Sequence, residues 1–152
     1  MKYLATIFAL SAAISAIDIS IIDDSHCDGP PMATWKSVQP DTCLSYHRPG
    51  AYAFDSVPTN WAIITRAYKK QGCPGNSLAN QFHSNGKDRV CIGWSWPNSG
   101  YYGAGYSFND QTKRSESSVV SEKRCIKPDL LHLQDGQTYN ATGLEDDVVE
   151  LM

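Results

Sequence analysis

The feature that most constrains the fold of this chain is a pattern that occurs twice in it. Residues 22–29, Ile-Asp-Asp-Ser-His-Cys-Asp-Gly, align with residues 68–75, Tyr-Lys-Lys-Gln-Gly-Cys-Pro-Gly. Each stretch has an apolar or aromatic residue, four polar or small residues, and then Cys-x-Gly. Self-similarity of this kind predicts two similar structural units, at about residues 19–57 and 64–108.

The five cysteines follow the same repeat. A second cysteine comes 16 residues after the cysteine of the first pattern and 18 residues after that of the second. In an oxidising compartment, five cysteines are expected to form two bridges and leave one thiol. The candidates are Cys27, Cys43, Cys73, Cys91 and Cys125.

The local texture of both units is typical of β-strands. Residues 61–68 and 89–94 are rich in β-branched and aromatic side chains, and glycine and proline separate such segments. No segment in the middle of the chain keeps a helical period, and residues 76–84 allow one short helical turn at most. The sequence therefore predicts an all-β domain.

The spacing Tyr68-x4-Cys73-x-Gly75, followed by Ser107, resembles the Greek-key motif of the βγ-crystallins. The resemblance implies a disulfide-stapled sandwich of two Greek keys, with Gly29 and Gly75 at turns of positive φ. The family also includes calcium-binding members. Calcium is not expected here, because residues 51–55 and 102–106 lack the paired Asn or Asp ligands before the closing serines.

Within such a sandwich we expect one bridge inside each unit, Cys27–Cys43 and Cys73–Cys91, each adding about 3 kcal/mol of stability. A competing arrangement joins Cys125 to an earlier cysteine and fastens the C-terminal segment to the core. The sequence leaves this choice open.

The N-terminal residues 1–16 are predicted to be a signal peptide. Lys2 provides a positive charge, residues 3–14 are mostly apolar, and Ser15 and Ala16 suit a signal peptidase. The apolar run ends too early at Asp18 to span a bilayer, so a secreted, extracellular protein without a membrane span is expected. The layout resembles the small cysteine-rich secreted proteins of filamentous fungi, which include effectors and killer toxins.

The mature chain is expected to form one β domain, residues 17–124, with a loosely attached C-terminal extension, residues 125–152. Without Lys2, 12 basic residues face 16 acidic ones, which argues against a nucleic-acid partner. Asn140 begins the only N-glycosylation sequon in the sequence, Asn140-Ala-Thr142, so Asn140 is the candidate site for an N-linked glycan. The sequence does not decide whether the chain is cleaved by a protease at the dibasic pair Lys123-Arg124.

No catalytic set is recognisable in the sequence. The histidines have no metal-ligand spacing, and no metal or cofactor is expected; they are His26, His47, His83 and His132. Two enzyme hypotheses rest on particular residues. A thiol nucleophile would pair Cys125 with His132. A ribonuclease would draw on the acid/base and phosphate-binding residues His83, Glu116 and Arg89.

Residues 94–102 form a turn-rich segment with four aromatic residues: Trp94, Trp96, Tyr101 and Tyr102. Such side chains stack on sugar rings or on a partner protein, or they fill the core of a sandwich, and the second interpretation is favoured.

These observations predict a secreted, non-enzymatic effector or toxin-like protein that binds a protein or a cell-surface glycan of a host or competitor. The alternatives are a carbohydrate-binding wall or surface protein and a small secreted ribonuclease or hydrolase.

Overall fold

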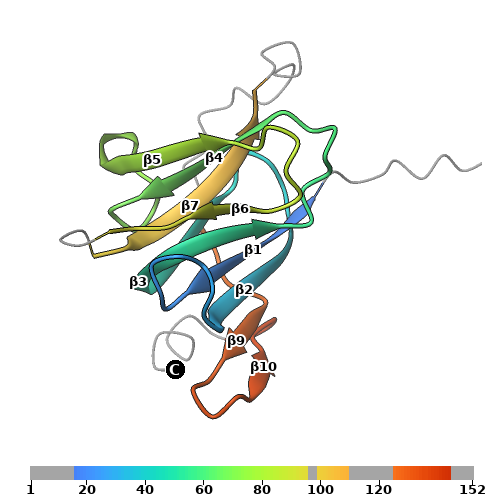
Figure 1. Cartoon of the computed structure of the whole chain (residues 1–152). Coiled ribbons are helices and arrows are strands. Elements are labelled where there is room, and N and C mark those ends of the chain that lie inside the picture. Colours follow the sequence, from blue (N-terminus) through green and yellow to red (C-terminus); the bar gives the residue numbers. More distant parts are fainter. Residues whose placement is uncertain (1–15, 96–98, 110–124, 145–152) are drawn as a thin grey trace, which may run out of the picture.

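The computed structural model describes residues 16–95, 99–109 and 125–144 (Figure 1). Within these residues the chain forms β-strands, one 3-10 helix and no α-helix. The elements are β1 (Ile17–Ile22), β2 (Pro31–Val38), β3 (Cys43–Asp55), β4 (Ile63–Tyr68), η1 (Gly75–Ser77), β5 (Leu78–His83), β6 (Val90–Ile92), β7 (Tyr101–Phe108), β8 (Cys125–Ile126), β9 (Leu130–His132) and β10 (Thr138–Asn140). The predicted all-β class is confirmed, and the strands expected at 61–68 and 89–94 are β4 and β6. None of the helices in this part of the chain is long and apolar enough to cross a membrane.

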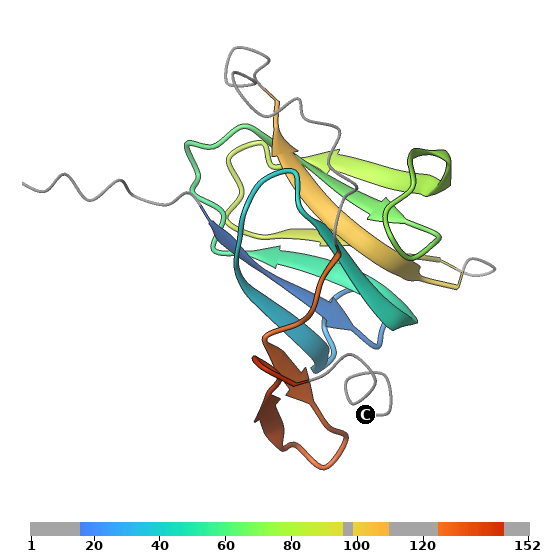
Figure 2. The ribbon, with the colours of Figure 1, turned by 180° about the vertical axis from the view of Figure 1, so that it is seen from behind.

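The long strand β3 belongs to two sheet layers (Figures 1 and 2). Its residues 51–55 pair with β1, and three of them also pair with β6. Its first residues pair with β7 on one side and with β8 on the other. One layer therefore has the order β10-β9-β2-β1-β3-β6 and the other β5-β4-β7-β3-β8. All pairs are antiparallel except β3 with β8.

The two sequence units exchange strands through this arrangement. The first unit supplies β1, β2 and β3, and the second supplies β4 to β7. Strand β6 of the second unit lies in the layer of the first unit, and the start of β3 lies in the layer of the second. Each layer is thus completed by a strand from the other unit.

Strand β3 changes layer near Gly50. Its register with β7 shifts between Ser45 and Gly50, which marks the bend. A Cβ atom at Gly50 would lie 2.6 Å from the carbonyl oxygen of Ile22 and 2.8 Å from the side chain of Ile21. Only glycine allows the backbone of β3 to pass this close to β1.

Side chains from both layers form one core between them. The first layer contributes the large aromatic side chains of β2 and β3, and the second contributes residues of β4 and β7. Fully buried members are Ile19, Trp35, Tyr52, Phe54, Leu44, Ile63, Ala104 and Tyr106. Burial of this apolar surface, at about 25 cal/mol per Å², is the main force that holds the layers together.

Two buried tyrosines in this core differ in their hydrogen bonding. The Tyr106 hydroxyl donates to the carbonyl oxygen of Val38 at 2.8 Å. The Tyr52 hydroxyl is buried without a hydrogen-bond partner among the described residues. Burial raises the pKa of both phenols, so both remain protonated.

Replacing these tyrosines by phenylalanine should have opposite consequences. Tyr106→Phe should lower the free energy of unfolding by about 1–2 kcal/mol, because the Val38 carbonyl loses a donor inside the core. Tyr52→Phe is the matched control and should leave stability unchanged or raise it by about 1 kcal/mol, because it removes an unsatisfied polar group. Urea unfolding followed by tryptophan fluorescence measures both. Equal destabilisation by the two variants would contradict this account.

Residues 125–144 are not loosely attached, contrary to the sequence expectation. Strand β8 pairs with β3 in one layer, β9 pairs with β2 in the other, and β10 continues from β9. The indole N–H of Trp35 donates to the carbonyl oxygen of Ile126 at 2.9 Å. The Asp129 carboxylate accepts the backbone N–H of Lys36 at 2.6 Å. This segment therefore covers one edge of each layer.

His132 connects the added hairpin to the sandwich. Its Nε2 lies 3.1 Å from the Thr34 hydroxyl, and its Nδ1 lies 3.0 Å from that of Thr138. Burial lowers the pKa of His132, and the positive charge of Lys36 lowers it further. The folded state therefore binds fewer protons than the unfolded state at mildly acidic pH.

This difference predicts that the His132 contribution to stability depends on pH. Because the folded pKa is depressed, the contribution is present above the unfolded value of about 6.5 and is lost as the pH falls toward the folded pKa. The stability advantage of the wild type over His132→Gln should shrink between pH 7.5 and pH 5. Thermal unfolding of both proteins across this range measures it. An advantage that grows with acidification would refute the assignment.

The two disulfides join the units to each other, and the expected bridges within each unit are wrong. Cys27 is bonded to Cys91, with 6.1 Å between the Cα atoms, and Cys43 is bonded to Cys73, with 5.9 Å. The strand exchange explains the pairing, because it brings β6 beside the first unit and the start of β3 beside the second. The bridges close loops of 64 and 30 residues, for which about 3–4 kcal/mol each is typical.

The expected positive φ angles at Gly29 and Gly75 are also wrong. The positive φ angles occur two residues earlier, at Cys27 (62°) and Cys73 (49°). The role of Gly29 is steric instead, because a Cβ there would lie 2.7 Å from a carboxylate oxygen of Asp24. The two repeated stretches nevertheless share an unusual backbone at the same position.

Candidate functional site

The structure does not gather the described aromatic residues of segment 94–102, which are Trp94, Tyr101 and Tyr102, into one exposed surface. Tyr101 is buried, and its hydroxyl accepts from the Asn80 side chain and donates to the Gly93 carbonyl oxygen. Trp94 is half-buried against the core, and Tyr102 is half-buried. Trp96 lies outside the described residues.

The candidate catalytic residues that the structure describes interact with groups outside the candidate sets. The thiol of Cys125 lies beside Cys43 and Ser45, whereas both ring nitrogens of His132 face threonines. Arg89 forms an ion pair with Asp55 at 3.1 Å and donates to the Cys27 carbonyl oxygen. Glu116 lies outside the described residues.

Of the other histidines, His26 bonds the Ser25 hydroxyl through Nδ1 at 2.6 Å, and the ring of His47 contacts that of Tyr46 at 4.5 Å between centroids. In the described part of the chain, no three His, Cys, Asp or Glu side chains are grouped so that they could hold a metal ion.

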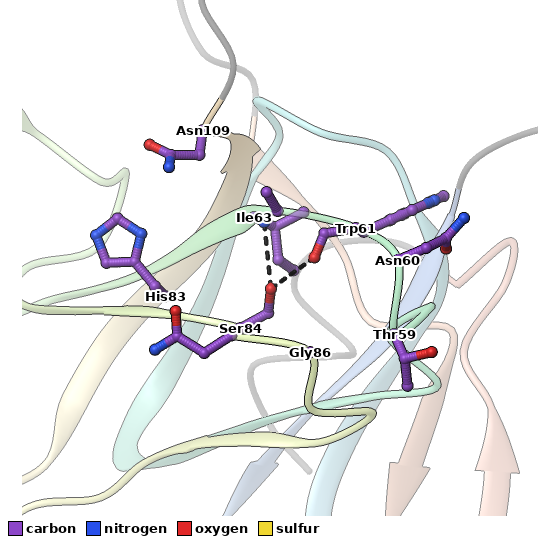
Figure 3. Close-up of a pocket in the computed structure, with 10 residues that line it drawn as sticks. Thr59, Asn60, Trp61, Ile63, His83, Ser84, Gly86 and Asn109 are labelled. Carbon is purple, nitrogen blue, oxygen red and sulfur yellow. Dashed lines mark hydrogen bonds between the residues drawn. The ribbon is translucent and has the colours of Figure 1, made fainter.

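One polar pocket lies at the end of the sandwich, where three connections meet (Figure 3). The loop before β4, the loop after β5 and the end of β7 form its walls. Its volume is 220 Å³, and its lining residues are Thr59, Asn60, Trp61, Ala62, Ile63, His83, Ser84, Asn85, Gly86 and Asn109.

The buried side chain of Ser84 joins the walls of this pocket. Its hydroxyl donates to the Trp61 carbonyl oxygen at 2.8 Å and accepts the Ile63 N–H at 3.3 Å, as Figure 3 shows. The backbone N–H of Asn109 donates to the Ala62 carbonyl oxygen at 2.8 Å and fixes the third wall. The pocket is therefore held by local hydrogen bonds on a rigid sandwich.

The turn after Ser84 shapes the lower wall. Asn85 has a φ of 48° and Gly86 a φ of 76°, which are left-handed conformations that these two residue types tolerate best. The Lys87 N–H donates back to the Ser84 carbonyl oxygen at 2.9 Å and closes the turn.

The chemistry of the pocket is neutral and rich in hydrogen-bonding groups. Three side-chain amides, those of Asn60, Asn85 and Asn109, offer both donors and acceptors, and His83 adds an imidazole. Among the residues that the structure describes, no Asp, Glu, Lys or Arg lines the pocket. The indole of Trp61 points away from His83 in Figure 3 and packs edge-on against Phe108, 5.0 Å between centroids.

A second pocket, of 240 Å³, lies between the bend of β3 and β9. Its positive charge, Arg48, is already paired with Asp23 at 3.1 Å. Its imidazole, His132, has both nitrogens at hydrogen-bonding distance from threonines. Fewer groups remain there to recognise a ligand.

Among the residues of the first pocket, the sequence predicts a functional role only for His83, as an acid or base of a ribonuclease. The three asparagines lie in separate loops, and isolated asparagines in loops are ordinary turn residues. Their meeting depends on the strand order, which the sequence alone did not provide.

The fold and the disulfides define the class of this protein: a cysteine-rich, disulfide-bonded, β-sandwich-like all-β domain. The family model ARB_05566_N, described as an N-terminal domain, matches residues 18–129, which is more than half of the 152 residues. The chain therefore belongs to this family. No curated protein and no solved structure matches the chain.

The role of Ser84 predicts the effect of removing its hydroxyl. Ser84→Ala should lower the free energy of unfolding by about 2 kcal/mol, because the part-buried Trp61 carbonyl and the buried Ile63 N–H both lose a partner. The exposed Asn60 provides the control, because its φ is not positive, and Asn60→Ala should change stability by less than about 0.5 kcal/mol. Urea denaturation measures the difference. A Ser84→Ala protein as stable as the wild type would show that the hydroxyl does not hold the walls.

Proposed function

We propose that this protein is a secreted, non-enzymatic effector or toxin-like protein, and that it binds a neutral glycan on the surface of a host or competitor cell. The observation that carries the proposal is the uncharged, amide-rich pocket formed by Asn60, Asn85, Asn109 and His83.

The pocket composition favours a polyhydroxylated ligand over a charged one. Each sugar hydroxyl donates one hydrogen bond and accepts others. An amide side chain can pair with it in both ways, because its oxygen accepts and its NH2 group donates. A phosphate or a carboxylate would need a positive side chain, and a cationic ligand a negative one. The described lining residues include neither kind of side chain.

The pocket size favours recognition of a single sugar ring. Its 220 Å³ is below the range of about 300–1,000 Å³ that is typical for drug-sized ligands. The ligand is therefore expected to be one residue of a glycan, such as the end of a chain. Such contacts are weak individually, so binding to a polymer is expected to gain from repeated sites.

Several features support secretion. Residues 1–16 have the composition of a signal peptide, and two disulfides are typical of an oxidising compartment. Asn140 of the sequon lies exposed on β10, where a glycan would be accommodated.

We also infer that the domain is a βγ-crystallin-like pair of Greek keys. The support is the exchange of strands between the layers and the positive φ at the matching residues Cys27 and Cys73. One element of the motif is absent from the described contacts, because the buried Ser107 hydroxyl has no hydrogen-bond partner there.

Retention on insoluble chitin, cellulose and β-glucan tests the glycan proposal. The oxidised protein should be retained on at least one polymer and released by the matching free monosaccharide. Asn60→Ala and Asn109→Ala together should reduce retention at least about tenfold, because each amide contributes about 1 kcal/mol of hydrogen bonding and neither residue has a positive φ.

Asn76→Ala is the matched control, since Asn76 lies exposed in η1, which follows β4 at the opposite end from the pocket. It should bind as the wild type does. No retention on any polymer, or equal retention of the double variant, would reject the pocket as a glycan site.

The effector or toxin role is tested on plant tissue and competing microbes. Oxidised protein should cause cell death or growth arrest, and reduced and alkylated protein should not. Glycan binding without any effect on cells would reject this role and leave the glycan proposal standing.

A further inference from the structure

Three of the five cysteines lie together at the start of β3. Cys43 and Cys73 form a disulfide, and the Sγ of Cys125 lies 3.4 Å from the Sγ of Cys43. The backbone imposes this proximity, because Cys43 and Cys125 are register partners in the parallel pair of β3 and β8. The Cys27–Cys91 bridge has no such third cysteine, since all five cysteines lie within the described residues.

We propose that Cys43, Cys73 and Cys125 form a thiol–disulfide exchange site. The thiol of Cys125 loses its proton, and the thiolate attacks the Sγ of Cys43. The Cys43–Cys125 bond forms as the Cys43–Cys73 bond breaks, and the electron pair passes to the Sγ of Cys73, which takes a proton from water. The number of disulfides is unchanged, so the step needs no oxidant or reductant.

The attacking side of this site is open to solvent. Cys125 is exposed, whereas Cys43 and Cys73 are 2% and 5% exposed. The Ser45 hydroxyl donates to the Sγ of Cys125 at 3.5 Å and accepts the Gly72 N–H at 2.7 Å. Ser45 therefore holds the attacking sulfur beside the bridge that it would open.

The leaving side provides acceptors for a new thiol. The Sγ of Cys73 lies 3.6 Å from the carbonyl oxygens of both Leu44 and Ala104. A protonated Cys73 can donate to either oxygen without moving, so its burial is tolerated.

Exchange would move a covalent connection from one segment to another. In the present pairing, the bridge fastens the turn between β4 and β5 to β3. After exchange, the bridge would fasten β8 to β3 and leave that turn to hydrogen bonds such as the Gly72 to Ser45 contact. The protein would thus exist in two covalent forms of the same composition.

Tryptic mapping separates the two forms, because each of the five cysteines lies on its own tryptic peptide. Purified oxidised protein is kept at pH 5, 7 and 8.5 for increasing times, quenched in N-ethylmaleimide, digested, and analysed by mass spectrometry. We expect a Cys43–Cys125 peptide pair with label on Cys73, and it should appear faster at pH 8.5 than at pH 5, because the thiolate and not the thiol is the nucleophile. The Cys27–Cys91 pair should stay constant.

Two variants sharpen the test. Cys125→Ser should keep Cys43–Cys73 at every pH, and Ser45→Ala should slow exchange severalfold while circular dichroism confirms an intact fold. The proposal is overturned if folded wild type at pH 8.5 keeps only Cys43–Cys73 with label on Cys125. It is also overturned if the Cys27–Cys91 pair rearranges at the same rate, since that would indicate general scrambling.

Discussion

The whole architecture depends on the passage of β3 from one layer to the other. A strand of 13 residues is long enough to serve two sheets only if its backbone can pass close to β1 at the bend, and Gly50 provides that passage. Side chains on either side of the bend, Leu44 before it and Phe54 after it, are both buried in the same core. The two halves of the chain therefore stabilise each other, and neither half has a complete sheet of its own.

The covalent and terminal connections follow from the same passage. Because β6 and the start of β3 lie in the layer of the other unit, each disulfide crosses between units. Segment 125–144 then completes the outer edges, through β8 beside β3 and β9 beside β2. Exposed edges of sheets invite pairing with other chains, and this segment covers one edge of each layer.

The polar pocket uses the rigidity that this framework provides. Its residues come from loops, but the backbone atoms beside Trp61, Ser84 and Asn109 are fixed by hydrogen bonds to neighbouring strands or loops. The amide side chains on these loops are exposed and do not contribute to the core. The recognition proposed for this pocket and the stability of the fold therefore depend on different side chains, and Ser84 links the pocket walls to the core.

Local features of the fold could be predicted from the sequence, and long-range ones could not. β-branched and aromatic residues at 61–68 and 89–94 indicated strands because they fit a half-buried sheet. The repeated Cys-x-Gly pattern located two connections with the same backbone, although the positive φ falls on Cys27 and Cys73 and not on the glycines. Disulfide pairing depends on which strands become neighbours, and spacing along the chain favoured Cys27–Cys43 over the distant Cys91. The meeting of Asn60, Asn85 and Asn109 is long-range in the same way.

The crossed disulfides also determine how the chain must mature. Cysteines emerge during synthesis in the order 27, 43, 73, 91 and 125, so in an oxidising compartment Cys27 and Cys43 are available to each other before either native partner exists. An oxidant acting on the growing chain would join these two first, since the shorter loop costs less entropy to close. That early bridge must be reopened before Cys27 can meet Cys91, 64 residues away. Where oxidation precedes folding, the crossed pairing is therefore reached through disulfide isomerisation, and the yield should then depend on an isomerase more than on an oxidase.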